Sequence, residues 1–127
     1  HKAVLNRLLK AYENPDIFYQ VLRRNFEAKF GTANPFVFWY EDLINQLELI
    51  ISKVSHLQIL EIVKEICKNP KENSTGFPDL FVYNGLDFFF AEVKSENDHL
   101  SNKQLHWIHF MQKLAVPVKI IRPVVTF

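Results

Sequence analysis

Two carboxylates and a lysine stand near the ends of the most hydrophobic hairpin that the sequence predicts. Asp79 comes directly before the first strand, and Glu92 and Lys94 close the second strand. Because side chains alternate between the two faces of a strand, Glu92 and Lys94 share a face, and antiparallel pairing brings Asp79 close to them. Charged side chains avoid burial unless they are paired or bind a metal ion. We therefore expect these three side chains to converge at one end of the hairpin.

Such a cluster has two explanations. Two carboxylates at close range repel each other unless a positive charge lies between them, and oxygen ligands of this kind suit magnesium or manganese. A bound metal ion lowers the pKa of water and stabilises charge on a phosphate, so that the cluster could hydrolyse a phosphodiester with help from the lysine. The alternative is a structural salt bridge at a strand end, in which Lys94 pairs with Asp79 or Glu92. The three residues alone do not decide between the two.

Hydrophobic periodicity predicts helices on both sides of this hairpin and a final strand after the last helix. The predicted helices cover residues 3–13, 15–30, 41–53, 56–68 and about 101–115, and the predicted strands cover residues 80–83, 88–93 and 118–125. Asn84-Gly85 predicts the turn between the first two strands, because both residues tolerate a positive φ. Residues 70–76 are polar and rich in turn formers, so we expect a mobile loop there. This order of elements predicts a small α/β or α+β domain.

Helix starts are marked by capping residues at three places. Asn14 followed by Pro15 predicts the beginning of the second helix. Ser55 with Gln58 has the spacing of a capping box. Ser101 is most economically the cap of the last helix.

Composition limits the class of protein. The 127 residues are enough for one domain with a core, and 48% hydrophobic with 23% charged residues excludes a wholly disordered chain. No apolar run is long enough to cross a bilayer, and residues 1–20 do not resemble a signal peptide. The single cysteine, Cys67, excludes an internal disulfide and a cysteine-rich zinc site. A formal net charge of +1 neither indicates nor excludes a nucleic-acid-binding protein.

The amino-terminal end is locally basic. Residues 1–30 carry six basic against three acidic residues; a solvated helix face is the favoured interpretation, and DNA contact by Arg23 and Arg24 is the alternative. The chain begins at His1 rather than at methionine, which fits either a piece of a larger protein or a cloning remnant.

Other residues are assigned to the core. His106 and His109 lie three apart on a predicted helix, without an acid or cysteine placed to bind the same metal, so we do not expect a zinc site. Trp107, Cys67 and the aromatic run 36–40 are each expected to pack inside the protein rather than to contact a base or react.

The hairpin residues also carry a resemblance to known nucleases. Pro78-Asp79 followed by Glu92-Val93-Lys94 resembles the PD-(D/E)XK signature. The segments GFPDLFVYN, FAEVKSENDHLSNKQLHWI and MQKLAVPVKI resemble the VRR-NUC (virus-type replication-repair nuclease) family of that superfamily. The dense part of the resemblance covers residues 76–121, and the NDxLSxKQxxW segment makes an otherwise weak pattern strong. The resemblance implies an α/β fold with a restriction-endonuclease-like core (helix, β-hairpin, helix, strand) and extra N-terminal and inserted helices.

The resemblance also implies a metal site with its catalytic groups. Lys94 matches the catalytic lysine, and Gln104 matches a helix glutamine expected beside it. Glu27 is placed by a looser match, and its alternative is a surface ion pair with Arg23 or Arg24. Lys103, like the two arginines, could contact DNA phosphates. The implied metal ligands for Mg²⁺ or Mn²⁺ are Glu27, Asp79, Glu92 and the carbonyl of Val93.

We therefore expect one VRR-NUC nuclease domain over residues 1–127. Residues 1–40 would form the N-terminal helices and the aromatic segment, residues 41–68 an inserted helix pair, and residues 76–127 the catalytic core. The implied activity is metal-dependent cleavage, as an endonuclease or exonuclease, of branched or 5′-flap DNA repair intermediates inside the cell, away from membranes.

Two shapes occur among proteins of this kind. Compact members resemble dimeric Holliday-junction resolvases, whereas members with extra helices before the hairpin are monomeric and cut near 5′ flaps. The helices predicted over residues 41–68 favour the monomer, with further DNA-binding domains in a longer parent chain as possible partners. A homodimeric Holliday-junction resolvase and a catalytically inactive DNA-binding module are the alternatives.

Overall fold

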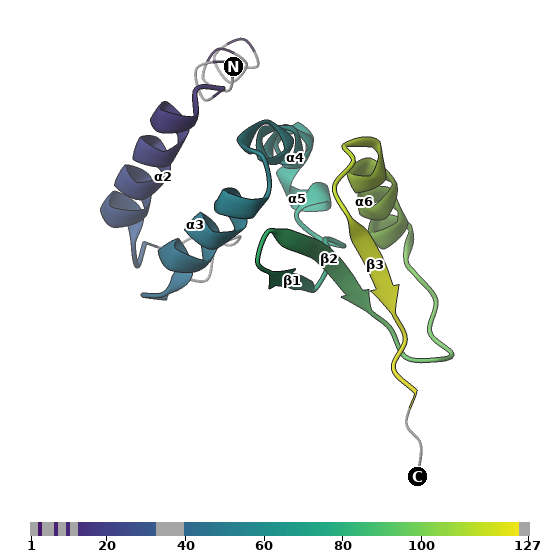
Figure 1. Cartoon of the computed structure of the whole chain (residues 1–127). Coiled ribbons are helices and arrows are strands. Elements are labelled where there is room, and N and C mark those ends of the chain that lie inside the picture. Colours follow the sequence, from purple (N-terminus) through teal and green to yellow (C-terminus); the bar gives the residue numbers. More distant parts are fainter. Residues whose placement is uncertain (1–2, 4–6, 8–9, 11–12, 33–39, 125–127) are drawn as a thin grey trace. The chain divides into compact units, whose positions relative to one another are not determined.

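The structure is a computed structural model of the chain, and it describes residues 3, 7, 10, 13–32 and 40–124 (Figure 1). Two compact units, residues 1–64 and 65–127, are described here one at a time. The predicted helix over residues 3–13 and the aromatic run over 36–40 lie mostly outside the described residues. The elements are α2 (Pro15–Lys29), α3 (Leu43–Lys53), α4 (His56–Lys68), α5 (Pro70–Asn73), β1 (Leu80–Asn84), β2 (Asp87–Val93), α6 (Asn102–Lys113) and β3 (Val118–Ile121).

Helix α2 of the first unit begins where its cap predicts. The side-chain oxygen of Asn14 accepts hydrogen bonds from the backbone N–H groups of Asp16 (3.0 Å) and Ile17 (3.3 Å). Pro15 occupies the first helical position, where its missing N–H costs nothing. No residue of α2 is fully buried, so its apolar stripe is covered less than the sequence predicts.

Helices α3 and α4 supply the buried residues of the first unit. Ile44, Ile51 and Val54 are at most 8% exposed, and Leu60 on α4 is 1% exposed. The predicted capping box before α4 forms, because the Ser55 hydroxyl accepts from the N–H of residue 58 and the Gln58 side chain accepts from the N–H of residue 55. None of the helices in the described part of the chain is long and apolar enough to span a membrane.

The expectation of a loop over residues 70–76 is wrong for its first half, which forms the single helical turn α5. The side chain of Asn69 caps this turn by accepting from the N–H of Glu72, and Pro70 takes the first helical position. This is the same Asn-Pro arrangement that starts α2. The dipeptide that ends α4 therefore also begins a new helix.

A three-stranded sheet forms the centre of the second unit. Its order is β1-β2-β3, with β1 antiparallel to β2 and β2 parallel to β3. Helix α6 lies in the crossover between the two parallel strands (Figure 1). β3 ends at Ile121, earlier than predicted, and Pro123 shortly afterwards lacks the N–H that would extend the ladder.

The hairpin turn lies one residue later than predicted. Asn84 pairs with Asp87 as the last residues of the ladder, so Gly85 and Leu86 are the central residues of the turn. Gly85 has a φ of +62°, whereas Leu86 is not among the residues with a positive φ. A positive φ at the first central position alone is the pattern of a type II′ turn. The strand bounds and the pairing are otherwise as the sequence predicts.

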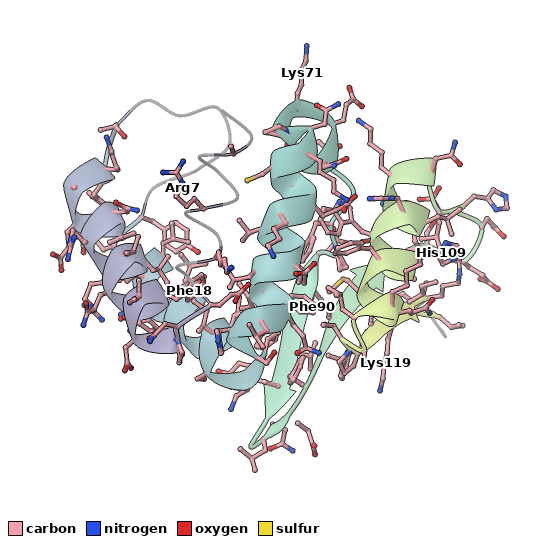
Figure 2. The ribbon with its side chains drawn as sticks, turned by 90° about the horizontal axis from the view of Figure 1, so that it is seen from above. Arg7, Phe18, Lys71, Phe90, His109 and Lys119 are labelled. Carbon is pink, nitrogen blue, oxygen red and sulfur yellow. The ribbon has the colours of Figure 1, made fainter. Side chains whose placement is uncertain are left out.

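The core of the second unit is built from aromatic residues of the sheet and α6. Trp107 and Met111 are 0% exposed and Phe90 is 5% exposed. The Phe77 ring contacts the rings of Phe90 and Trp107 edge-on, with centroids 5.5 Å and 5.1 Å apart. Phe90 lies among other side chains in Figure 2, whereas Lys71 points away from the ribbon. The prediction that Trp107 packs in the core is confirmed.

Candidate active site

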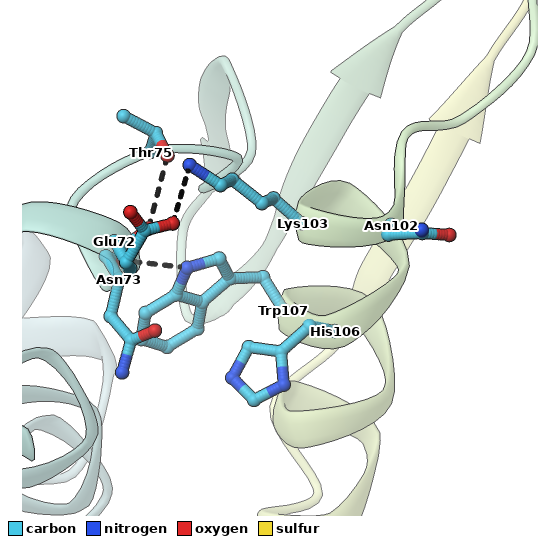
Figure 3. A pocket seen from close by; sticks show the side chains of 7 residues that line it. All are labelled: Glu72, Asn73, Thr75, Asn102, Lys103, His106 and Trp107. Atoms are coloured by element: carbon cyan, nitrogen blue, oxygen red, sulfur yellow. Dashed lines mark hydrogen bonds and ion pairs between the residues drawn. The ribbon is translucent and has the colours of Figure 1, made fainter. Parts of the chain in front are cut away.

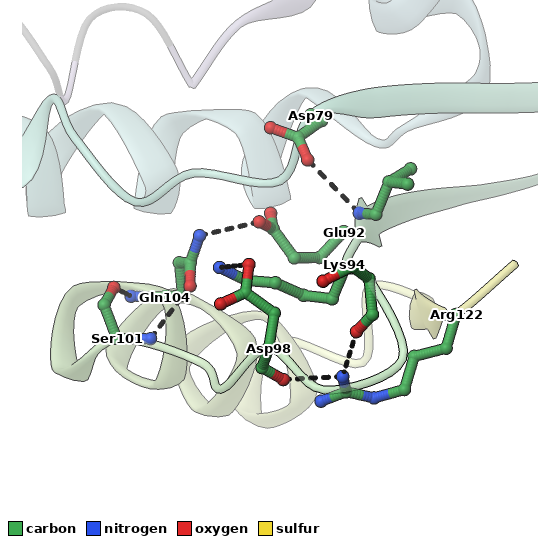
Figure 4. A network of polar contacts seen from close by, with 9 residues as sticks. Asp79, Glu92, Lys94, Asp98, Ser101, Gln104 and Arg122 are labelled. Carbon is green, nitrogen blue, oxygen red and sulfur yellow. Dashed lines mark hydrogen bonds and ion pairs between the residues drawn. The ribbon is translucent and has the colours of Figure 1, made fainter.

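The structure brings Asp79 to the end of β2, which carries Glu92 and is followed directly by Lys94 (Figure 4). Its Oδ2 atom accepts a hydrogen bond of 3.2 Å from the backbone N–H of Val93, the residue between them. Asp79 is exposed, whereas Glu92 is only 2% exposed. The hairpin register thus places two carboxylates side by side, one of them inside the protein.

The proline before Asp79 explains why the ladder ends here. The N–H of Lys94 donates to the carbonyl of Ile121 on β3 (2.9 Å), so the backbone groups of Val93, one residue earlier, face the opposite edge, towards β1. In the continued register Val93 would stand opposite Pro78, which has no N–H to donate. The N–H of Val93 donates to the Asp79 carboxylate. The carbonyl oxygen of Val93 faces the same edge, with no donor from Pro78.

Glu92 is held by an amide from α6. The Nε2 atom of Gln104 donates to its Oε1 atom at 2.7 Å. Burial raises the pKa of Glu92, the neighbouring Asp79 carboxylate raises it further, and the Lys94 ammonium opposes both effects. A buried carboxylate beside a second carboxylate favours the arrival of a cation or a proton.

Gln104 is oriented by the helix cap to which it belongs. Its side-chain oxygen accepts from the N–H of Ser101 (2.8 Å), and the Ser101 hydroxyl accepts from the N–H of Gln104 (3.1 Å). Because the cap occupies the amide oxygen, the amide NH₂ group is left to face Glu92. The predicted cap thus forms, and Gln104 contacts the glutamate of the cluster.

Lys94 pairs with a residue that the sequence did not single out. Its ammonium lies 3.9 Å from Oδ2 of Asp98, and its side chain is 15% exposed. Arg122 fastens the loop between them, because its Nη1 atom donates to the carbonyls of Ser95 (2.8 Å) and Asp98 (2.6 Å). Asp98 falls within the NDxLSxKQxxW segment, which could have indicated it. Nothing in the sequence around Arg122 indicates this role, because the carbonyls that it contacts lie more than twenty residues earlier in the chain.

The donor set fits a hard divalent cation. Asp79, Glu92 and the carbonyl of Val93 offer oxygen atoms at one edge of the sheet, which are the ligands preferred by Mg²⁺ and Mn²⁺. No group of three His, Cys, Asp or Glu side chains gathers in the described part of the chain, so water or substrate oxygens would complete the coordination. Magnesium sites are commonly built in this way, from one or two carboxylates.

A zinc site at the histidines is not formed among the described residues. His106 does have an acidic neighbour, because its Nε2 atom lies 3.2 Å from Oε1 of Glu65. Lys68 also pairs with Glu65, at 2.9 Å. Glu65 is therefore engaged in ion pairs rather than presented to a metal.

Three of the remaining predicted site residues belong to the first unit, and Lys103 belongs to the second. Arg23, Arg24 and Glu27 are exposed residues of α2 in the first unit, and Arg23 pairs with Glu48 of α3. Lys103 on α6 pairs with Glu72 at 3.1 Å. The part of Glu27 in metal binding and of Lys103 and the two arginines in DNA binding stays a prediction.

The sequence profile of the VRR-NUC domain matches residues 13–124, and the chain belongs to this family. The resemblance seen in the sequence is confirmed. Among curated relatives, the chain is 28% identical over 108 residues to a Fanconi-associated nuclease 1 homolog of Pseudomonas aeruginosa, covering 81% of this chain and 19% of that protein. It is 33% identical over 73 residues to the homolog of Schizosaccharomyces pombe, covering 56% of this chain and 10% of that protein.

Solved structures show the same fold. Crystal structures of paFAN1 bound to 5′-flap DNA with a gap superpose with TM-scores of 0.79 and 0.80, at 23% identity. The matches cover 98% of this chain and 24% of the longer one. The predicted α/β fold with a restriction-endonuclease-like core is confirmed. The chain spans about a fifth or less of the length of the two curated relatives named above.

Proposed function

We propose that this domain is a metal-dependent, structure-specific DNA nuclease that hydrolyses phosphodiester bonds in branched or 5′-flap DNA. The observation that carries the proposal is the buried Glu92 beside Asp79, at the strand end where Asp79 accepts from the N–H of Val93 and Lys94 follows. Burying a carboxylate next to another lowers stability unless a bound cation offsets it. The family and the 5′-flap DNA in the matched structures support the substrate class.

Each group at the strand end has a role in this hydrolysis. Asp79, Glu92 and the Val93 carbonyl would hold Mg²⁺ or Mn²⁺, with Glu27 as a further ligand. When bound, such an ion lowers the pKa of water and neutralises charge on a phosphate oxygen. Lys94 would orient the attacking water and stabilise the charge that develops on the phosphate. Gln104 keeps the Glu92 carboxylate turned towards the site.

The assembly that we propose is a monomer cutting near a flap, with DNA contacts from Arg23, Arg24 and Lys103. A resolvase must present two active sites to a symmetric junction and would therefore be a two-fold dimer. A net charge of +1 gives little affinity for plain duplex at physiological salt, so branch geometry would supply the selectivity.

The test is a cleavage assay on end-labelled 5′ flaps, forks, four-way junctions and plain duplex. Each substrate is incubated with the chain in EDTA, Mg²⁺, Mn²⁺ or Ca²⁺. We expect cuts near the flap with Mg²⁺ or Mn²⁺, none in EDTA and few with Ca²⁺, whose loose coordination positions water poorly.

Three results would contradict the proposal in different ways. Cleavage that persists undiminished in EDTA would remove the metal from the mechanism. Binding of flap DNA without cleavage under any condition would favour the inactive binding module. A stable dimer by light scattering, with paired symmetric nicks in the four-way junction, would favour the resolvase.

A further inference from the structure

The segment of residues 72–79, here called the docking segment, carries Asp79 to the site and lies against α6 (Figure 3). The Nε1 atom of Trp107 donates to the backbone carbonyl of Asn73 at 3.0 Å. Nearer the start of α6, the Lys103 ammonium pairs with the Glu72 carboxylate at 3.1 Å. These contacts fasten the first half of the docking segment to the helix.

The second half approaches α6 more closely than any side chain would permit. Gly76 has a φ of +82°, and a Cβ atom built on it would lie 2.7 Å from both the carbonyl carbon and the Cβ of Lys103. It would also lie 2.9 Å from the Lys103 carbonyl oxygen. Backbone atoms of a helix cannot give way as a flexible side chain can. Any residue other than glycine would therefore push the docking segment away from α6.

The residue after Lys103 is Gln104, whose amide holds Glu92. The first turn of α6 therefore contacts the Glu92 carboxylate through the Gln104 side chain, and it contacts the backbone three residues before Asp79 through Gly76. We infer that the close approach of Gly76 to Lys103 sets the position of Asp79 relative to Glu92. Gly76 and Trp107 are thus positioning residues for the proposed metal site, and the inference rests on that proposal.

A different role for Gly76 would be to supply a positive φ and nothing more. The chain contains a matched control for this alternative, because Gly31 has a φ of +81° and a Cβ there would meet nothing within 4 Å. Gly31→Ala introduces the same backbone strain without a collision. The difference between Gly76→Ala and Gly31→Ala therefore isolates the contact with Lys103.

The experiment compares the two variants with the wild-type chain by three measurements. Thermal unfolding should show a lower Tm for both variants. In the metal-free protein, amide hydrogen exchange of Val93, whose N–H is bonded to Asp79, should become faster in Gly76→Ala only. Mn²⁺ affinity, measured by calorimetry without DNA, should fall about 10- to 100-fold in Gly76→Ala, as for other residues that orient metal ligands.

Trp107→Phe is a second and milder variant. It removes the N–H that bonds to the Asn73 carbonyl and keeps an aromatic ring against Phe77. We expect faster Val93 exchange and a smaller loss of Mn²⁺ affinity than in Gly76→Ala. If Gly76→Ala does not fold, this variant decides, and unchanged Val93 exchange in Trp107→Phe would then overturn the inference.

The inference is also overturned if folded Gly76→Ala matches Gly31→Ala in both Val93 exchange and Mn²⁺ affinity. Failure of the proposed function is a separate result, since it would appear as a wild-type chain that binds no Mn²⁺. Val93 exchange in the metal-free variants would still test whether Gly76 positions Asp79.

Discussion

The two ends of the β1–β2 hairpin reverse the usual rule of burial. At the turn, Leu86 is 94% exposed, whereas at the strand ends Glu92 is 2% exposed. Leucine is among the residues most often buried and glutamate is almost never fully buried without a partner. An exposed leucine on a turn is inexpensive, but a buried carboxylate destabilises the fold unless it is hydrogen-bonded or meets a cation.

The surroundings of the two ends explain the difference. The turn ends in the pair Asn84–Asp87, both exposed. The other end is covered by the first turn of α6 through Gln104 and is adjoined by the loop that Arg122 fastens. Polar groups of the hairpin are therefore gathered and covered at the strand ends, where chemistry is proposed. The turn of the same hairpin is exposed to solvent.

The strongest test of this contrast removes one carboxylate at a time. Asp79→Ala or Glu92→Ala should lower cleavage of 5′-flap DNA by more than about 10³-fold, which exceeds the loss of a single stabilising donor. Asp87→Ala, at the turn, should cut at the wild-type rate. Cleavage is measured at saturating Mg²⁺, with circular dichroism to check folding. Near wild-type turnover by either site variant would show that the site is wrongly placed.

Removal of the lysine should have the next largest effect. Lys94→Ala should reduce kcat by about 10²–10³-fold, because one contact to the transition state is lost, while Mn²⁺ affinity stays close to that of the wild type. Lys119→Ala is the control, since its ammonium lies over the Phe89 ring, 4.2 Å from the ring centroid. Loss of folding and metal binding together in Lys94→Ala would instead support a structural salt bridge.

Loss of the contacts between Arg122 and the loop of residues 95–98 should have a smaller effect. Arg122→Ala removes two hydrogen bonds to backbone carbonyls, which should lower the free energy of unfolding by about 1 kcal/mol. It should also lower kcat several-fold, because Asp98 is no longer held beside Lys94. Arg122→Lys should recover part of both losses. Equal kcat values for all three proteins, measured beside urea unfolding, would confine Arg122 to stability.

The smallest effect concerns stability and pH in the metal-free protein. Because burial and Asp79 raise the pKa of Glu92, the folded chain holds this proton more tightly than the unfolded chain does. The free energy of unfolding should therefore fall as pH rises from about 4.3, the pKa of an unfolded glutamate, up to the raised pKa. Glu92→Gln should remove this part of the pH dependence in urea titrations.

A control from the turn completes this comparison. Leu86→Ser should change the free energy of unfolding by no more than about 0.5 kcal/mol, and it should leave the pH dependence intact. An unaltered pH profile in Glu92→Gln would show that the carboxylate is better solvated than the 2% exposure of the residue indicates.

Local signals predicted the parts of the fold that depend on neighbouring residues. The cap at Asn14, the capping box at Ser55 and the strand alternation through Glu92 need only a few residues of context. The turn was misplaced by one residue, because Asn84 can either close a ladder or enter a turn. The helical turn after Asn69 was missed, since the same dipeptide stops one helix and starts the next.

The site was predicted only where its residues carry a motif. The convergence of Asp79 with Glu92 follows from pairing in a hairpin, which sequence order determines. The contacts of Arg122 and the approach of Gly76 to Lys103 join segments that are distant along the chain. Nothing in the local sequence distinguishes a glycine needed for its φ from one needed for its missing side chain.

The double use of Gln104 has a consequence for mutational tolerance. Glutamate serves a capping box as well as glutamine does, so Gln104→Glu would leave the start of α6 intact. The same substitution would place a third negative charge against Glu92, where an amide now donates at 2.7 Å. A substitution that helix propensity and capping score as harmless would therefore be among the least tolerated, because two carboxylates would face each other at a buried position.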